Sequence, residues 1–574
     1  MKRIIFRVIR FAGTLLAVFN LLMFFAMRPC WSGISSTLGY KGGGNEFLYY
    51  LPVFICILFF ITALADLVLK AIFDKEWLHI MFLSISVVFL GAIIYIIANG
   101  ANNYMRFVWP KFFIGLAAAA AILALYFLLF VYPKTFLKDN KIFKFGLLGL
   151  SGVLALGLLL HFSVNRITYK PVVYAVEKNY QIVFSSNSES LGWVEVGDQC
   201  YYDTYAGSTK KFEKVHKVEV PMTVLDSAKK YTVHVKQSIY CGPFGGFLGR
   251  DISQTVDFRP VDSSDGIQYL AFSDIHMNDW QTEKTASKAG QYDFLVLAGD
   301  AISDVETFED ANFINKVANK ITGGSMPVVY ARGNHDVKGR YGERTHQFTG
   351  SKGEKFYYTF FFDNVYGIVL DLGEDHDDDW WEYYDTAHYA DYHQEQIEFL
   401  QNEINKLNNG DYADYKYHLT ACHIPITFVN KRHNHTEVKA QMTELLNQMD
   451  IDMLLCGHQH DIMIFEPGLV TPNEKLTYNS EYLPNKTYKG YLTDFNFPAF
   501  MVSKPGFTFK DEPDLSAAKS QIGLYVDADL VGKKETCYYL NSRGEKVDVM
   551  NMWAEKHYGT EITIDLTTKV FTSN

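Results

Sequence analysis

The stretch PVVYARGNHD (residues 327–336) joins a run of apolar, β-prone residues through Arg332 to Gly333, Asn334, His335 and Asp336. A tight turn accounts for the glycine and the asparagine, because both residue types favour turns. It does not account for a histidine followed by an aspartate. The stretch therefore predicts a buried strand whose carboxyl end carries side chains with a chemical role.

Four other places in the chain repeat this pattern of an apolar strand that ends in histidine or aspartate. The strand candidates are IQYLAF (267–272), FLVLA (294–298), YHLTAC (417–422) and DMLLC (452–456), and helical candidates lie at 307–321, 392–408 and 436–449. Strands that alternate with helices predict an α/β fold. In open α/β sheets the ligand site lies outside the carboxyl ends of the strands. We therefore expect the five strand ends to meet at one rim.

Seven side chains of the metal-ligand type follow these strands. They are Asp274, His276, Asp300, Asn334, His423, His458 and His460. Mixed oxygen and imidazole ligands suit Mn, Fe, Zn or Ni better than Ca or Mg alone. Seven ligands are too many for one ion, and they suit two ions that share a carboxylate, a known device for phosphate-ester hydrolysis. Each motif is weak by itself, so the prediction depends on all five occurring in order.

The motifs together resemble the calcineurin-like metallophosphoesterase superfamily over roughly residues 265–465: SDIH, GD, GNHD, an isolated histidine before Ile-Pro, and GHQH. The resemblance implies a four-layer α/β fold, in which a two-sheet β sandwich is flanked by helices. It also implies two divalent transition-metal ions (Mn, Fe or Zn). One ion would be bound by Asp274, His276 and His460, the other by Asn334, His423 and His458, and Asp300 would bridge them.

The order of a β module followed by this domain also resembles the domain layout of purple acid phosphatases. The sequence departs from the pattern of that subfamily at two positions. That subfamily has no histidine in the first motif, where this sequence has His276. It also has a metal-binding tyrosine three residues after the bridging aspartate, where this sequence has Ser303. The iron–tyrosinate chemistry of that subfamily is therefore not expected here.

His335 is the histidine of GNHD that is not an expected metal ligand. We expect it to stabilise or protonate the leaving oxygen, with Asp336 holding its imidazole. Simple capping of the next segment is the alternative for Asp336. Arg340 is the expected substrate contact beside His335, because a guanidinium can bind two phosphate oxygens. Arg332 is a weaker candidate, because an ion pair would occupy it.

The acidic segment GEDHDDDWWEYYD (373–385) follows another apolar run. A solvated loop is the plain interpretation. If the loop shapes the pocket, Trp380 and Trp381 would stack on a base or an aromatic leaving group, and His376 would add a polar contact. None of the three is expected to bind a metal ion.

Five β-prone runs lie between residues 171 and 260, separated by Asn, Ser, Gly and Asp turns. They predict a small sandwich of the fibronectin type III kind, acting as a spacer or packing module. Residues 1–165 differ in being mostly apolar with few charges. Runs at roughly 8–27, 49–72, 79–98, 111–132 and 144–163 each have about the twenty residues that cross a bilayer as a helix. They predict five transmembrane helices, with a cleaved signal peptide as the alternative for the first.

We therefore expect a multi-domain protein: a membrane domain at 1–168, a fibronectin III-like sandwich at 169–260 and a calcineurin-like metallophosphoesterase domain at 261–574. Lysines and arginines near the span ends place the N-terminus in the cytoplasm and the chain after residue 165 outside. The expected localisation is thus a multi-pass integral protein of the plasma or cytoplasmic membrane, with its catalytic domain outside the cytoplasm.

The expected function is hydrolysis of phosphate esters by attack of a metal-bridging hydroxide. A lipid-linked or cell-envelope ester is the favoured substrate and membrane lipids are expected partners, since the anchor keeps the site near the membrane. The net charge of −11 argues against a nucleic-acid surface. The alternative is a non-catalytic membrane sensor or scaffold that uses the same metal site to bind a ligand.

Overall fold

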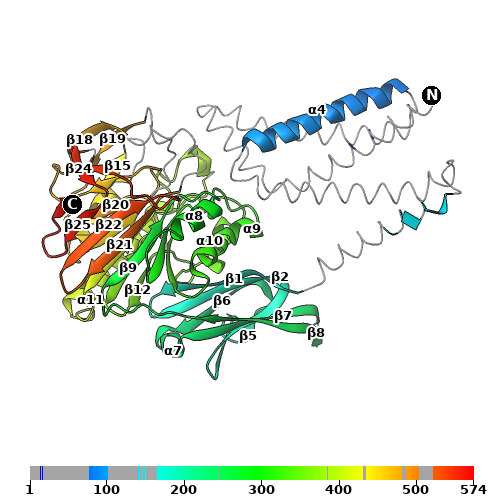
Figure 1. Cartoon of the computed structure of the whole chain (residues 1–574), viewed down its shortest axis with the longest axis horizontal. Helices are drawn as coiled ribbons and strands as arrows, with labels where there is room; N and C mark the ends of the chain where they lie inside the picture. Colours follow the sequence, from blue (N-terminus) through cyan, green and yellow to red (C-terminus); the bar gives the residue numbers. More distant parts are fainter. Residues whose placement is uncertain are drawn as a thin grey trace. The chain divides into compact units, whose positions relative to one another are not determined.

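The structure is a computed structural model that describes residues 165–574 except 243–244, 384, 431–434, 481–485, 503–520, 552 and 574. Before residue 165 it describes one helix, α4 (Glu76–Gly100), and a few isolated positions. The chain divides into two compact units, Met1–Val164 and Asn165–Asn574 (Figure 1). Each unit is described by itself.

The predicted transmembrane helices are not borne out. Among the described residues, no helix is both long enough and apolar enough to cross a bilayer. The apolar run at 79–98 falls within α4, and the other four runs fall almost wholly outside the described residues. This finding overturns the predicted multi-pass localisation, and with it the expected membrane lipids and the outside position of the catalytic domain. A run of apolar residues predicts burial, and its length alone does not establish that a bilayer buries it.

The second unit is built on a mixed sheet of 13 strands. Its centre is three parallel strands, β9 (Ile267–Phe272), β10 (Phe294–Ala298) and β11 (Pro327–Ala331). Antiparallel strands continue the sheet beyond β9 in the order β21 (Gly523–Asp529), β22 (Lys534–Leu540), β25 (Ile562–Asp565) and β26 (Phe571–Ser573). The three central strands are apolar and almost fully buried, as the sequence pattern predicts for strands covered on both faces.

The segment predicted as a separate sandwich is instead joined to this sheet. Strand β1 (Ile167–Val176) runs parallel to β11, with Val173 opposite Pro327 and Tyr174 opposite Val328. The sheet continues through β2 (Asn179–Val196), β7 (Lys230–Gly242) and β8 (Gly245–Asp257), and β3 (Gln199–Tyr202) and β6 (Glu213–Pro221) also pair with β2. Helix α7 (Met222–Ala228) and the pair β4 (Thr204–Tyr205) and β5 (Thr209–Lys210) complete the segment. An exposed strand edge accepts any matching strand, so the sequence does not reveal this pairing.

A second sheet faces the first. Its order is β12 (Tyr358–Phe362), β13 (Val365–Val369), β14 (Tyr417–Ala421), β16 (Met453–Cys456), β20 (Ala499–Met501) and β17 (Ile464–Phe465). Smaller sheets are formed by β15 (Phe428–Asn430), β19 (Thr487–Leu492) and β18 (Lys475–Asn479), and by β23 (Val549–Asn551) and β24 (Lys556–Gly559). One apolar core lies between the two large sheets, with Val296 and Val329 from the first and Leu419 and Leu455 from the second.

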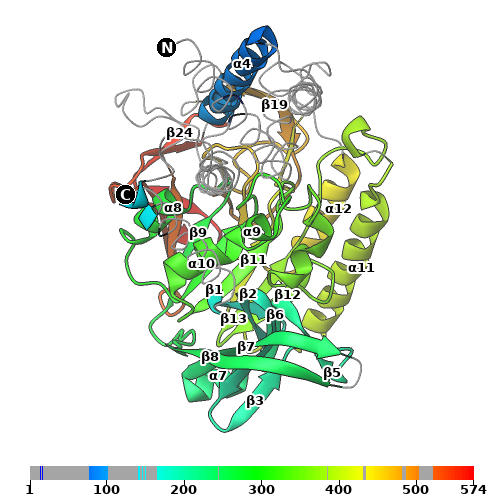
Figure 2. The ribbon, with the colours of Figure 1, turned by 90° about the vertical axis from the view of Figure 1, so that its right-hand side faces the viewer.

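Helices cover the outer faces of both sheets. Helices α8 (Asp279–Ala286), α9 (Phe308–Ala311) and α10 (Phe313–Thr322) lie on the side of the first sheet, while α11 (Tyr389–Asn408) and α12 (Thr436–Leu446) lie side by side over the second (Figure 2). Leu400 of α11 and Leu446 of α12 pack in a second core with Leu454 of β16. The fold is thus an α/β arrangement with a mixed sheet, in which the carboxyl ends of strands from both large sheets lead into the loops of the site.

Candidate metal centre

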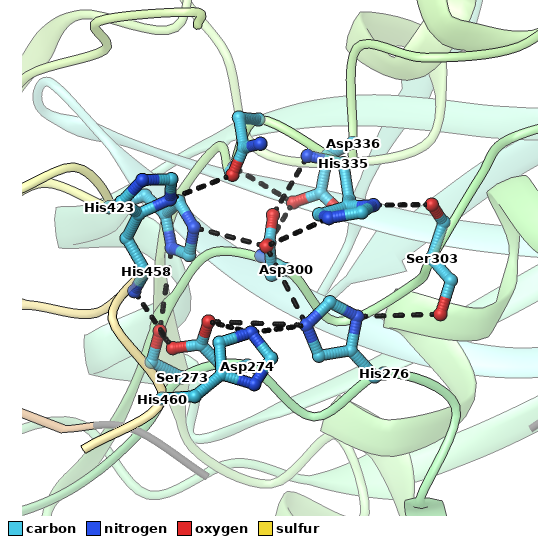
Figure 3. A network of polar contacts seen from close by, with 12 residues as sticks. Ser273, Asp274, His276, Asp300, Ser303, His335, Asp336, His423, His458 and His460 are labelled. Atoms are coloured by element: carbon cyan, nitrogen blue, oxygen red, sulfur yellow. Dashed lines mark hydrogen bonds and ion pairs between the residues drawn. The ribbon is translucent and has the colours of Figure 1, made fainter. Parts of the chain in front are cut away.

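Four of the predicted ligands converge on one point. One ligand atom each from Asp274, His276, Asp300 and His460 can be chosen so that all four lie within 4.8 Å of one another (Figure 3). Asp274 and His276 follow β9, Asp300 follows β10, and His460 follows β16 of the second sheet. The backbone N–H of His458 donates to Asp274 Oδ2 (3.0 Å), which ties the GHQH loop to the SDIH loop across the two sheets.

The donor set at this point fits a divalent transition-metal ion. His460 Nε2 lies 3.2 Å from Asp274 Oδ1. It also lies 3.0 Å from His276 Nε2, with the two rings stacked at a centroid distance of 4.8 Å. Nitrogen and carboxylate ligands of one such ion lie roughly 3–3.5 Å apart when each bond is near 2.1 Å. The chemistry and the spacing of these side chains therefore suit Zn, Mn or Fe.

The remaining predicted ligands lie on the other side of Asp300. His423 Nε2 is 3.1 Å from Asp300 Oδ2, and its Nδ1 donates to the carbonyl of Ala298 (2.8 Å). His458 Nδ1 is 3.1 Å from Asn334 Oδ1. Asp300 Oδ2 also lies 3.7 Å from His276 Nε2, so Asp300 stands between the two groups. A bridging carboxylate needs this position, and the division of the seven residues between two ions stays a prediction.

The electrostatics of Asp300 favour positive charge beside it. Burial alone would raise the pKa of its carboxyl, but the neighbouring histidines, His423 first, hold that pKa well below its usual range. Burial likewise opposes protonation of His423, yet Asp300 raises the pKa of the imidazole to about 10. A bound cation can replace such a proton, because metal ions compete with protons for the same lone pairs.

His335 has a different partner from the one predicted. Its Nδ1 donates to the carbonyl of Ser303 (2.7 Å), and its Nε2 lies 4.0 Å from Asp300 Oδ2. Asp336 is buried, and its Oδ2 accepts from the backbone N–H groups of Gly333 (2.9 Å) and Asp300 (3.1 Å) and from the hydroxyl of Tyr330 (2.8 Å). Asp336 therefore holds two loops together and does not hold the imidazole.

Ser303 contacts two histidines of the site, a role that the sequence motif did not indicate. Besides accepting from His335 through its carbonyl, it places its Oγ 3.3 Å from His276 Nδ1. Ser303, which stands where purple acid phosphatases have a tyrosine, thus orients two histidines of the site (Figure 3). Gly333 is required for a spatial reason, because a Cβ there would lie 2.1 Å from Asp300 Oδ1.

The two arginines near the GNHD turn differ in their surroundings. Arg332 pairs with Asp371 (2.6 Å) and stacks over the ring of Phe356, so the ion pair weighed from the sequence is present. Arg340 is exposed, just before the 3-10 helix η4 (Gly342–Gln347). Its contact with substrate stays a prediction.

Sequence reasoning missed three residues that touch the site. Asp375 Oδ2 lies 2.6 Å from His458 Nε2, and Glu374 Oε2 accepts from Asn334 Nδ2 at 3.4 Å. Lys486 donates to the carbonyl of Gln459 (2.7 Å), which steadies the GHQH loop. The acidic run 373–385 is the signal that could have indicated the first two, since only its tryptophans and His376 were expected to shape the pocket. Trp380 in fact stacks on His376, with ring centroids 4.1 Å apart.

Residues 267–461 match the model of the calcineurin-like phosphoesterase family. The chain contains a calcineurin-like phosphoesterase domain. The match covers all seven predicted ligands and confirms the resemblance drawn from the motifs. The family match and the cluster of candidate ligands together indicate a metal-dependent phosphoesterase.

Solved structures show weak similarity to the chain that carries this calcineurin-like domain. The purple acid phosphatase PPD1 from yellow lupin (Lupinus luteus) seeds has 12% identity and a TM-score of 0.44, over 70% of this chain and 74% of that one. PhoD has 10% identity and a TM-score of 0.40, over 72% and 93%. GAP50, the anchor in the inner membrane complex of Plasmodium, has 11% identity and a TM-score of 0.31, over 50% and 87%. No curated protein matches the sequence.

Proposed function

We propose that the protein hydrolyses phosphate esters at a centre of two divalent metal ions held by the seven predicted ligands. One observation carries the proposal: ligand atoms of Asp274, His276, Asp300 and His460 lie within 4.8 Å of one another. His423 approaches the same Asp300 from the other side at 3.1 Å, which supports a second ion and a bridging role for Asp300.

The metal ions, when bound, would lower the pKa of a water molecule and neutralise the phosphoryl oxygens. The chain itself contributes His335, whose side chain is 35% exposed and therefore accessible to a substrate. In its protonated form the ring donates through Nδ1 to the Ser303 carbonyl and keeps Nε2–H for the leaving oxygen. His335 thus acts as the proton donor to the leaving group, with its ring held by Ser303.

Turnover by the full-length chain tests the proposal. The protein is loaded with Mn(II) or Zn(II) and assayed on p-nitrophenyl phosphate and bis(p-nitrophenyl) phosphate. We expect turnover by the wild type. Asp300→Asn should abolish turnover and reduce metal content, because it removes the charge shared by the two positions, whereas Asp265→Asn at an exposed position serves as the matched control.

Two results would contradict the proposal. Absence of turnover across a broad panel of esters, with two ions bound, would favour a protein that binds a ligand at this site without reacting. Retention of two ions and the full rate by Asp300→Asn would reject the bridging role.

A further inference from the structure

We propose that Glu374 and Asp375 are positioning residues for one of the two metal positions: they fix the ring of His458 and the amide of Asn334 so that both ligand atoms face an ion. The proposal rests on the proposed function, since it concerns the same centre. It assigns a role to the first two acids of the 373–385 loop, for which the family motifs provide none.

Asp375 decides which nitrogen of His458 carries a proton. His458 Nε2 lies 2.6 Å from Asp375 Oδ2, and His458 Nδ1 lies 3.1 Å from Asn334 Oδ1. An ionised carboxylate only accepts hydrogen bonds, so the proton belongs on Nε2. The lone pair of the neutral ring is then on Nδ1, beside Asn334. A carboxylate behind a ligating histidine in this way orients the ring and makes it a stronger ligand.

Glu374 decides which way the amide of Asn334 points. Asn334 Nδ2 donates to Glu374 Oε2 at 3.4 Å, which turns Oδ1 toward His458. Lys338 holds the other oxygen of Glu374 at 2.6 Å and offsets its charge. With the proton of His458 on Nε2 alone, Nδ1 of the ring and Oδ1 of Asn334 are both acceptors, and they lie 3.1 Å apart. Two acceptors so close repel each other unless a positive species lies beside both, and a metal ion is such a species.

The burial of these two acids separates them from the rest of the loop. Glu374 and Asp375 are 2% and 3% exposed, whereas Asp377 and Asp379 are exposed. Asp378 accepts from the backbone N–H of Tyr389 at the start of α11 (2.8 Å), a structural role. Burying a carboxylate is costly unless it is paired. The observed pairing with two expected ligands therefore gives the loop a function at the metal centre.

Metal binding by the full-length protein tests the proposal without relying on activity. Bound metal is first removed from the protein with a chelator. MnCl₂ is then titrated in, and its affinity is measured by isothermal titration calorimetry or by competition with a chelator of known affinity. We expect two sites in the wild type. Asp375→Ala should weaken one of them about 10–100-fold and leave the other unchanged, as loss of a partner behind a metal-binding histidine typically does.

Matched variants make the test specific. Asp379→Ala removes the same charge from the same loop at an exposed position, and should leave both sites unchanged. Asp375→Asn keeps an acceptor for His458 Nε2–H and should fall between wild type and Asp375→Ala. Thermal melting identifies variants that do not fold. If Asp375→Ala is one of them, the test uses Asp375→Asn instead, and ¹⁵N NMR then measures which ring nitrogen of His458 carries the proton. A partial shift of the proton from Nε2 toward Nδ1 is expected there, because the neutral amide oxygen of asparagine is a weaker acceptor than a carboxylate.

The outcomes separate the two proposals. Equal Mn(II) binding by wild type and Asp375→Ala, or an equal loss in Asp379→Ala, would overturn the positioning role while leaving hydrolysis intact. Two normal sites with no turnover would overturn the proposed function alone. A wild type that binds fewer than two Mn(II) ions would overturn both.

Discussion

His335 and Ser303 form a pair in which the backbone of one residue orients the side chain of another. The carbonyl of Ser303 accepts from His335 Nδ1, while Ser303 Oγ reaches His276 Nδ1. Because the contact with His335 is made by a carbonyl, almost any side chain at position 303 can supply it. A serine at position 303 therefore keeps the orientation of His335, the proposed proton donor.

His335→Ala should retain two bound ions and lose most of the rate, by roughly 10²–10⁴-fold, because a proton donor is removed and no predicted ligand is touched. Metal content by elemental analysis and kcat on p-nitrophenyl phosphate measure the two effects separately. His388→Ala, at a side chain that is 79% exposed, is the control and should behave as wild type. Loss of metal with an unchanged rate per bound ion pair would show that His335 is a ligand instead.

At the scale of elements, the turn between α10 and β11 joins the N-terminal strands of the second unit to the strand that carries the GNHD loop. The hydroxyl of Tyr231 on β7 donates to the carbonyl of Gly324 (2.8 Å). Gly324 has a φ of +76°, and a Cβ there would lie 2.6 Å from the carbonyl oxygen of Pro171 on β1. Gly323, its neighbour, has a φ of +64° with nothing near.

This pair of glycines predicts two different costs. Gly323→Ala should lower the free energy of unfolding by only roughly 1–2 kcal/mol, the cost of placing alanine in the left-handed backbone conformation. Gly324→Ala should lose a further 1–3 kcal/mol or so, because its methyl group also collides with backbone across the β1–β11 junction. Urea unfolding of both variants measures the difference. Equal free energies of unfolding would mean that the junction is looser than its packing indicates.

At the scale of the whole molecule, a buried acid links the two large sheets. Glu535 on β22 of the first sheet accepts from the hydroxyl of Tyr417 on β14 of the second (2.7 Å), and Tyr417 also bonds Tyr269 of β9 (2.9 Å). Burial, with the nearby charge of Asp452, raises the pKa of Glu535 to about 8. The folded protein therefore prefers this carboxyl protonated.

The pH dependence of stability follows from the sign of that shift. The folded pKa lies above the ordinary value of 4.5, so the folded state binds more protons between those values. The contribution of Glu535 to the free energy of unfolding is fully present below about pH 4.5 and is lost as pH rises through 8. Glu535→Gln should remove this loss of stability, so that at pH 9 its free energy of unfolding exceeds that of the wild type by on the order of a few kcal/mol. Urea unfolding at pH 6, 7.5 and 9 measures it, with exposed Glu444→Gln as the control; a constant difference across pH would contradict the assignment.

Much of the site could be predicted because its signals are local. The strands at 267–272, 294–298 and 327–331 begin and end where their apolar runs do, and the ligand types stand directly after them. The partner of His335 could not be predicted, since Asp336 is adjacent in sequence yet its carboxylate accepts from Tyr330 and from backbone N–H groups. The prediction of membrane helices was wrong because the length of an apolar run indicates that the segment is buried, but does not indicate whether protein or lipid covers it.

The sequence by itself determined which residues carry side chains of the metal-ligand type and which short segments are buried strands, because residue chemistry and hydrophobic runs are properties of a few consecutive positions. Only the tertiary structure decided that β1 adds to the edge of β11, and that Asp375 reaches His458, 83 positions away. Both depend on pairing between distant parts of the chain. Many acids and many strand edges offer the same local chemistry, and packing selects among them.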